Sequence, residues 1–335
     1  MTNRTALALI SGGLDSILAA RIADSLPGIS VIGYHFRHPF AGETGDDGLL
    51  TAERAAFRAG LSIIVDSDDR GFIGMVKNPA HGRGKGVNPC RDCRIFILKK
   101  AARMLELIGG DFLVTGEVVG QRPMSQMRNS MFLIEKEAGL SGKILRPLCA
   151  KNLPPTIAEE KGWIRREDLY DFSGRNRKPQ MKLADEIGVD EYPSPAGGCA
   201  LTDLNFARRY EELEELAPEF GPTELESLKY GRHFRLPGGI KLIIARDEPE
   251  CIEMRRKLAA KFWFLDTPDI PGPLGALDRE PTEDELLSAA GLLASYGKAR
   301  RLDSVRMELI SPGGASRYFD VTPADKSDFR EYLIH

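Results

Sequence analysis

The fold is decided by residues 8–16, Ala-Leu-Ile-Ser-Gly-Gly-Leu-Asp-Ser, which join an apolar run to an alanine-rich segment. The apolar run, 5–10, has the length of a buried strand, and 14–25 has the composition of a helix. The two glycines between them let backbone N–H groups approach an anion without an intervening Cβ. The helix start behind them adds unpaired donors and a favourable dipole. We therefore expect a phosphate-binding loop at Ser11–Ser16.

Polar side chains in this loop also fit a nucleotide. Ser11 and Ser16 offer hydroxyl groups, and Asp15 offers a carboxylate that can hold Mg²⁺ against a pyrophosphate. No lysine follows the glycines, so the stretch is not the loop of the P-loop NTPases. The alternative is an ordinary tight turn between a strand and a helix. Asp15 and the two serines argue against that alternative.

The alternation of strands and helices continues after the loop. We expect strands at 29–36, 61–65 and 111–115, helices at 49–59 and 95–108, and a long surface loop over 66–88. Near-continuous apolar strands in this order predict an α/β fold with a doubly wound parallel sheet. Ligands bind such sheets beyond the carboxyl ends of the strands. Ser11–Asp15, Tyr34–Phe36 and Gly116–Gln121 all fall at such ends.

The second half of the chain has a different pattern. We expect helices at 163–168, 178–186, 206–217, 249–261 and 283–297, and strands at 233–236, 240–245, 304–310 and 316–321. We accordingly divide the chain into a doubly wound domain, 1–205, an acidic helical bridge, 206–227, and a smaller α+β domain, 228–335.

Three of the five cysteines have motif-like surroundings. Cys90 and Cys93 lie in Asn-Pro-Cys-Arg-Asp-Cys-Arg, directly before an expected helix, and Cys199 follows Ala-Gly-Gly. The helix dipole and Arg91 and Arg94 are expected to lower the pKa of the first two thiols. Structural zinc would require a fourth ligand, and a thioredoxin-like pair would require another strand order. Plain buried cysteines would not need these neighbours, so we expect reactive or metal-binding thiols.

Bulk properties limit the setting of the protein. The chain has 335 residues, a formal net charge of −3 and an odd number of cysteines. It has no apolar run near the ~20 residues of a membrane span, no signal peptide is expected, and the cysteines do not form a disulfide framework. We expect a cytoplasmic protein that does not enter a membrane.

Basic residues gather locally rather than globally. Residues 201–335 contain 19 basic and 25 acidic residues, which argues against a simple nucleic-acid-binding module. Within the chain, 81–103, 161–182 and 228–262 are rich in Lys and Arg and could contact a phosphate backbone. Solvated helix faces are the alternative for each stretch. The aromatic candidates for stacking on an RNA base are Tyr34, Phe36, Phe40 and Tyr192.

The loop resembles the SGGxDS motif of the PP-loop ATP pyrophosphatase superfamily, whose members cleave ATP between the α and β phosphates and adenylate a carbonyl. The resemblance implies a HUP-like fold of the adenine nucleotide alpha hydrolase type. It implies that Tyr34 and His35 meet adenine through their backbone, and that Gly116 and Gln121 lie near the α-phosphate. ATP and Mg²⁺ would then be bound by Ser11, Gly12, Gly13, Leu14, Asp15 and Ser16, with Mg²⁺ at Asp15.

The combination of this loop with a CxxC pair and a distant cysteine is similar to tRNA thiolases that use a [4Fe-4S] cluster. That resemblance implies that Cys90, Cys93 and Cys199 bind the cluster and leave one iron open for sulfide. The alternative within the same superfamily is persulfide chemistry, in which one cysteine carries sulfur and another resolves it. The longer motifs at 116–126, 173–180 and 192–199 resemble a thiouridylase-like group, and 233–257 and the residues after it resemble the RNA-binding domain of NFACT proteins.

Three functions remain open at this point. The first is an ATP-dependent tRNA sulfurtransferase with tRNA and a sulfur-donor protein or sulfide as partners; Asp15, Cys90, Cys93 and Cys199 would then be catalytic. The second is the same adenylation chemistry on a small molecule, for sulfur insertion or amide formation, with the tail serving a homodimer. The third is a non-catalytic protein that binds ATP or RNA.

Overall fold

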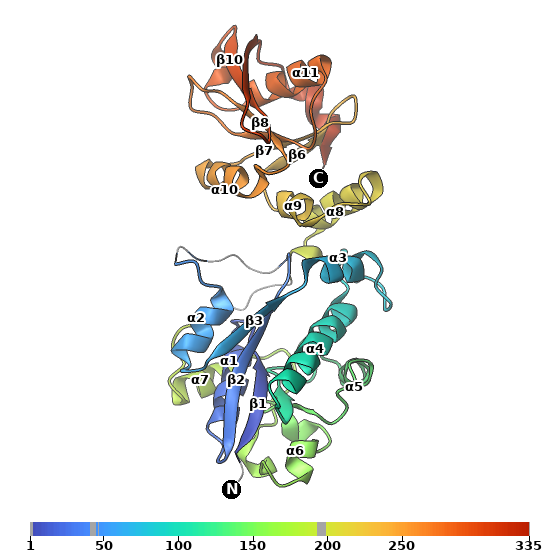
Figure 1. The fold of residues 1–335 in the computed structure, drawn as a ribbon, viewed down its shortest axis with the longest axis vertical. Helices are drawn as coiled ribbons and strands as arrows, with labels where there is room; N and C mark the ends of the chain where they lie inside the picture. Colours follow the sequence, from blue (N-terminus) through green and yellow to red (C-terminus); the bar gives the residue numbers. More distant parts are fainter. Residues whose placement is uncertain (1–2, 41–44, 46, 193–198, 335) are drawn as a thin grey trace. The chain divides into compact units, whose positions relative to one another are not determined.

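The computed structural model describes residues 3–40, 45, 47–192 and 199–334. The chain divides into two compact units, Met1–Cys199 (unit 1) and Ala200–His335 (unit 2), both drawn in Figure 1. The expected bridge, 206–227, therefore groups with unit 2. Within the described ranges, no helix combines the length and the apolar character that crossing a membrane requires.

Unit 1 is built on five strands in the order β3-β2-β1-β4-β5, and every pair is parallel. The strands are β1 (Arg4–Leu9), β2 (Ile29–Arg37), β3 (Ile63–Ser67), β4 (Phe112–Val114) and β5 (Ile144–Leu145). The chain winds outward from β1 in both directions, so the crevice between β1 and β4 is the switch point where such folds bind ligands. The predicted α/β doubly wound fold is confirmed.

Helices cover both faces of this sheet (Figure 1). They are α1 (Leu14–Asp24), α2 (Thr51–Arg58), α3 (Asp69–Lys77), α4 (Cys90–Leu107), α5 (Arg128–Glu137), α6 (Ile157–Glu160) and α7 (Lys178–Glu186). Alternate residues of β1 face opposite sides, as in any strand. Ala6 and Ala8 join a core with α1, α2 and α7, while α4 packs on the other face.

Two local expectations were wrong. Residues 66–88, expected as a surface loop, contain helix α3. The carboxylate of Asp68 caps this helix by accepting from Gly71 N at 2.9 Å, and Phe72, Ile73 and Val76 are buried. The expected helix at 163–168 is only a 3-10 turn, η2 (Arg166–Asp168). Helix α6 ends before that stretch begins.

Unit 2 contains a separate antiparallel sheet in the order β11-β10-β8-β9-β7-β6-β12. Its strands are β6 (Arg232–Arg235), β7 (Lys241–Ile244), β8 (Trp263–Asp266), β9 (Gly275–Leu277), β10 (Val305–Ile310), β11 (Ser316–Val321) and β12 (Leu333–Ile334). Its helices are α8 (Leu204–Leu216), α9 (Pro222–Ser227), α10 (Glu248–Leu258) and α11 (Glu283–Ala294). Successive residues of β7 point to opposite faces, so Leu242 packs with α11 and Ile243 with α10. The predicted α+β character of the C-terminal part is confirmed.

Candidate functional site

The loop after β1 has a conformation that leaves backbone donors at the start of α1. Gly12 has φ +82°, a conformation that residues with a Cβ rarely adopt. Helix α1 begins after Gly13, and no side chain caps it there. The hydroxyl of Ser16 folds back on the loop, donating to Gly13 O at 2.7 Å and accepting from Ser11 N at 3.2 Å. The remaining amides at this helix start can bind an anion.

Leu14 contributes to this loop only through its backbone. The side chain of Leu14 is buried in the hydrophobic core. The side chain of the next residue, Asp15, instead contacts the polar side chain of Gln121. The expected binding role of Leu14 is therefore restricted to its amide group.

Gly116, at the carboxyl end of β4, lies directly against this loop. A Cβ on Gly116 would stand 2.3 Å from the carbonyl oxygen of Asp15 and 2.5 Å from the amide nitrogen of Ser16. Both contacts are with backbone atoms, which cannot move aside as a flexible side chain can. The two segments that the sequence placed at neighbouring strand ends are thus in contact, and only glycine fits at the contact.

One carboxylate oxygen of Asp15 binds two side chains, and the other has no hydrogen-bond partner. Its Oδ2 accepts from Gln121 Nε2 at 2.8 Å and pairs with Arg177 Nη2 at 3.3 Å. Its Oδ1 is buried and has no hydrogen-bond partner. A carboxylate oxygen in that state suits a hard cation such as Mg²⁺.

Arg177 was not singled out by the sequence analysis, although it lies in one of the motifs noted there. The segment that carries it runs beside the Gly116–Gln121 motif. Gly174 N donates to Val119 O at 2.8 Å, and Val119 forms a parallel bridge with Ser173. Arg177 could have been suspected because it is a basic residue in the Gly- and Arg-rich motif 173–180, and the phosphate loop carries the carboxylate of Asp15.

The aromatic side chains of β2, Tyr34 and Phe36, are buried in the core rather than exposed to solvent. Tyr34 is buried and donates to Asp66 Oδ2 at 2.8 Å, and burial followed by this hydrogen bond raises the pKa of Tyr34. His35 contacts Ile10 O through Nδ1 at 2.8 Å, and burial lowers the pKa of His35. The expectation that Tyr34, Phe36 and Phe40 stack on a base is wrong, because all three are core residues.

Tyr192, the fourth aromatic candidate, is only partly buried and packs against the core of unit 1. It therefore has exposed surface that the other three lack. Tyr34 O accepts from Ile10 N at 2.8 Å, and Tyr34 and His35 both pair with β3, so the contact of their backbone with adenine that the resemblance implies stays a prediction.

Cys90 and Cys93 lie within the first turn of α4, not before it as expected. Asn88 Nδ2 contacts Cys90 Sγ at 3.2 Å. Burial, followed by the proximity of Cys199 and then Cys90, raises the pKa of Cys93 to about 12 and outweighs the opposing effect of Arg94. The expected lowering of the thiol pKa is thus wrong for Cys93. The same effect shows that all three predicted cysteines lie close together.

A buried ionic network connects the cysteine turn to the phosphate loop. Glu117, which follows Gly116, accepts from Arg94 Nε of α4 at 2.8 Å and from Arg146 Nε at 2.8 Å. Arg146 also pairs with the buried Glu135. Burial alone would raise the pKa of Glu117, but Arg94 and Arg146 lower it to about 2. The sequence analysis assigned no role to Glu117, Arg146 or Glu135.

Among residues 3–40, 45, 47–192 and 199–334, no three His, Cys, Asp or Glu side chains are placed to hold a metal ion. Cys90, Cys93 and Cys199 are therefore neighbours without the geometry of an assembled [4Fe-4S] site. We derive no chemical step through such a cluster.

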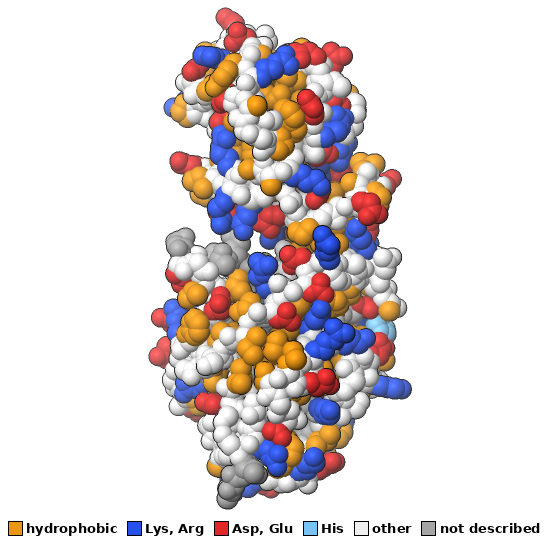
Figure 2. All heavy atoms as spheres, in the orientation of Figure 1, with side chains coloured by type: hydrophobic (Ala, Val, Ile, Leu, Met, Phe, Trp, Pro, Cys, Tyr) orange, Lys and Arg blue, Asp and Glu red, His pale blue; other side chains and the backbone are white. Residues whose placement is uncertain are grey.

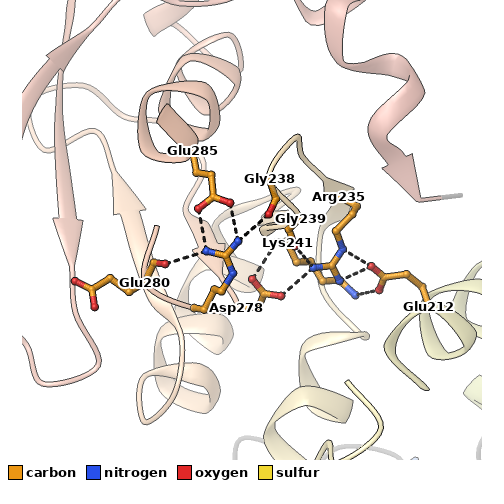
Figure 3. Close-up of polar contacts among 9 residues, drawn as sticks. Glu212, Arg235, Gly238, Gly239, Lys241, Asp278, Glu280 and Glu285 are labelled. Atoms are coloured by element: carbon orange, nitrogen blue, oxygen red, sulfur yellow. Dashed lines mark hydrogen bonds and ion pairs between the residues drawn. The ribbon is translucent and has the colours of Figure 1, made fainter. Parts of the chain in front are cut away.

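Most of the basic residues in the run 228–262 of unit 2 form ion pairs with carboxylates. Arg235 and Lys241 both bind Glu212 of α8, and Arg235 Nη1 also binds Asp278 at 3.0 Å (Figure 3). Figure 2 shows basic and acidic side chains interspersed on the visible face of this unit. Of the nine basic residues in the run, seven pair with a carboxylate: Lys229, Arg235, Lys241, Arg246, Arg255, Arg256 and Lys261.

Residues 231–333 match the family model of the NFACT protein RNA binding domain, which confirms the resemblance noted for this part of the chain. No curated protein sequence matches the chain. The fold and the site thus define a doubly wound α/β unit with an anion-accepting loop at its switch point, followed by a domain of the NFACT RNA-binding type.

Solved structures give weaker likenesses. The U34-tRNA thiolase NcsA from Methanococcus maripaludis with its [4Fe-4S] cluster is 14% identical over 68% of this chain and 72% of its own, with a TM-score of 0.34. A predicted subunit of a tRNA methyltransferase from Methanocaldococcus jannaschii is 16% identical over 66% of this chain and 91% of its own, with a TM-score of 0.38. A 4-thiouridine synthetase in complex with RNA and ATP is 20% identical over 67% of this chain and 53% of its own, with a TM-score of 0.38. TM-scores this low carry no conclusion about this chain.

Proposed function

We propose that this protein is an ATP-dependent tRNA sulfurtransferase, which adenylates a nucleobase carbonyl and replaces its oxygen with sulfur. The observation that carries the proposal is the connection between two predicted sites. Arg94, in the helix turn of Cys90 and Cys93, binds Glu117, whose neighbour Gly116 lies against Asp15. A phosphate loop and a thiol cluster joined in this way suit a reaction in which an activated carbon receives sulfur.

ATP would bind with its phosphates at the loop amides between Ser11 and Ser16. Gln121 and Arg177 orient Asp15 through Oδ2, and Arg177 adds a positive charge beside the departing pyrophosphate. Mg²⁺ would be held by Asp15 Oδ1, where it would neutralise charge on the pyrophosphate. Gly116 lies so close to the backbone of Asp15 and Ser16 that the position of the phosphate loop is fixed relative to β4.

The chemistry has two steps. The carbonyl oxygen of the base attacks the α-phosphorus of ATP, and pyrophosphate leaves. A sulfur nucleophile then adds to the adenylated carbon, and AMP leaves with the original oxygen. Cys90, Cys93 and Cys199 are the residues we assign to sulfur delivery: they would position a bound sulfide, or one of them would carry the terminal sulfur of a persulfide that a sulfur-donor protein transfers to it. In the persulfide route a second thiol attacks the inner sulfur, and an external dithiol must afterwards reduce the resulting disulfide.

The test measures pyrophosphate release and RNA thiolation with the full chain, ATP, Mg²⁺ and unmodified tRNA, supplied either with sulfide or with a persulfide donor and a dithiol. Asp15→Asn is expected to lose at least ~100-fold in both rates, because it removes the negative charge that would hold Mg²⁺ against the pyrophosphate. Asp111→Asn is the matched control, because Asp111 pairs with Arg4 beside the opposite end of β4. Wild-type protein that releases pyrophosphate without thiolating any tRNA would contradict the sulfurtransferase assignment.

A second experiment separates the two sulfur routes. Protein purified without oxygen is analysed for iron and sulfide, as wild type and as Cys199→Ser. Iron that is bound by the wild type and lost in the variant would support a cluster on these cysteines. Iron-free protein that thiolates tRNA with a persulfide donor and a dithiol, but not with sulfide alone, would exclude the cluster and support the persulfide route.

A further inference from the structure

Two cations of unit 2 lie against one tyrosine ring, and a third cation is within electrostatic reach of them. Arg232 begins β6, Arg300 lies in the 3-10 turn η4 (Ala299–Arg301), and Lys326 begins the 3-10 helix η5 (Lys326–Tyr332). The ring is that of Tyr296, just after α11. Lys326 Nζ lies 3.7 Å and Arg232 Cζ lies 5.5 Å from its centroid. Burial, then Arg300 and Arg232, lower the pKa of Lys326, which places all three cations within electrostatic reach of one another.

These three cations, like several other basic residues of the domain, form no ion pair with a carboxylate that the structure describes, but they also lie within electrostatic reach of one another. Within 200–334, no Asp or Glu forms an ion pair with Arg232, Arg300 or Lys326. The acid next in sequence, Asp325, accepts from Ser327 N at 2.9 Å and is influenced by Arg330. Uncompensated positive charge is costly to gather in one place, and an anion would relieve that cost.

The basic run 228–262, which looks positive in the sequence, does not offer such a site. Its arginines and lysines are mostly neutralised, as Arg235 and Lys241 are by Glu212 and Asp278 in Figure 3. Arg232 is a member of that run without a carboxylate partner, and it faces Tyr296 instead. The sequence alone therefore overestimates the positive charge that the run 228–262 offers to a ligand. It also gives no reason to single out Arg300 and Lys326, which lie outside the run.

The chemistry of the cluster fits a phosphate-bearing strand. Two guanidinium groups can each bind a phosphate by two hydrogen bonds, and an ammonium group adds a point charge. Tyr296 is half-buried, and its ring fixes Arg232 and Lys326 by cation–π contact. All four residues lie inside the segment 231–333 that matches an RNA-binding domain, which favours RNA over an acidic protein.

We propose that Arg232 and Lys326, which contact Tyr296, form with the nearby Arg300 the principal phosphate-binding site for RNA in unit 2. The proposal rests on the RNA substrate of the proposed function and assigns its backbone contact to these residues. It leaves the ion-paired residues of the basic run 228–262, which exclude Arg232, without a principal role in binding.

The experiment measures the affinity of the full chain for unmodified tRNA over a range of salt concentrations. In the triple variant Arg232→Gln, Arg300→Gln, Lys326→Gln, the slope of log K against log salt should fall by ~2–3, because each lost phosphate contact removes ~0.7–0.9. Binding near physiological salt should weaken at least ~10-fold. The charge-preserving variant Arg232→Lys, Arg300→Lys, Lys326→Arg should retain the slope, and its retention guards against misfolding as the cause.

The matched control removes the same charge from paired residues of the same domain. Arg246→Gln, Arg255→Gln, Arg256→Gln takes three exposed arginines from ion pairs with Glu250, Asp266 and Glu253. This variant should leave the salt slope within ~1 of the wild type. A control that loses as much slope as the test variant would overturn the proposal, because binding would then depend on charge number alone.

The outcomes also separate this proposal from the proposed function. Wild-type protein that thiolates tRNA, together with a test variant that keeps the full salt slope, would overturn this site alone. Wild-type protein that binds no tRNA would overturn the RNA substrate and this site together. If polyglutamate binds the wild type more tightly than tRNA at matched charge and the test variant loses that binding, the site takes an acidic protein and the proposal fails.

Discussion

Replacing Gly116 by alanine should damage the phosphate loop, because the added methyl group has no space. Its Cβ would lie 2.3 Å from the Asp15 carbonyl oxygen, 2.4 Å from the Asp15 carbonyl carbon and 2.5 Å from Ser16 N. Real Cβ contacts shorter than 3.0 Å are essentially never seen. The backbone at Asp15 must therefore move away from β4 by about 0.7 Å or more, or β4 must bend.

The cost can be worked from that displacement. Forcing one extra methyl group into a packed backbone contact costs about 1–3 kcal/mol of stability. A misplacement of about 1 Å in a reacting group can cost on the order of 100-fold in rate. We expect Gly116→Ala to unfold at lower urea concentration and to release pyrophosphate about 100-fold more slowly than the wild type. Asp15 Oδ1 would be displaced from the position in which it is proposed to hold Mg²⁺.

The matched control is Gly74→Ala in helix α3, where a Cβ would meet nothing within 4 Å. Alanine there should stabilise the protein by about 0.5–1 kcal/mol, because glycine weakens a helix interior. Urea unfolding and pyrophosphate release are measured on both variants. A Gly116→Ala protein with wild-type stability and rate would refute the contact between β4 and the loop, whatever the reaction is.

Two further changes test the buried charges and the C-terminal domain. Glu117→Gln leaves Arg94 and Arg146 without their shared carboxylate and should lower the free energy of unfolding by about 3–5 kcal/mol near neutral pH. Because the folded-state pKa of Glu117 is depressed from 4.5 to about 2, its contribution should be complete above pH ~4.5 and vanish as the pH falls toward 2; urea titrations of both proteins that stay equally far apart down to pH 2 would contradict this. Thr282→Ala removes the capping box of α11, in which the Thr282 hydroxyl accepts from Glu285 N, and should destabilise unit 2 by about 1 kcal/mol. A thermal unfolding curve of the full chain unchanged by Thr282→Ala would show that the cap contributes nothing.

Much of unit 1 could be predicted from its sequence because its strands are buried on both faces. Such strands read as continuous apolar runs, and 5–10 and 29–36 gave β1 and β2 nearly to the residue. Helix α3 was missed because Gly71 and Gly74 weaken its helical pattern, while its capping by Asp68 is a local contact that composition does not reveal. The strand order of unit 2 could not be predicted, because antiparallel pairing joins segments far apart in the chain.

The site residues that belong to sequence motifs could be predicted. Residues that reach the site by pairing with charges far away in the sequence could not. The loop residues and Gln121 were named from the sequence, and the structure brings Gln121 onto Asp15. Arg177 reaches the same carboxylate from another segment, which only the fold can reveal. The thiol pKa at Cys93 was predicted in the wrong direction, because burial and neighbouring sulfurs outweigh a nearby arginine.

The carboxylate of Glu117 has a consequence for how this protein can change over evolution. It accepts from Arg94 in the helix of the cysteines and from Arg146 beyond β5, and it has no access to water that could replace either partner. A substitution at Arg94 would leave Glu117 with one of its two buried cationic partners, so it should be tolerated best when Glu117 changes too. Among relatives of this protein, positions 94 and 117 should therefore covary. Lineages that lose Cys90 and Cys93 should also lose this pair.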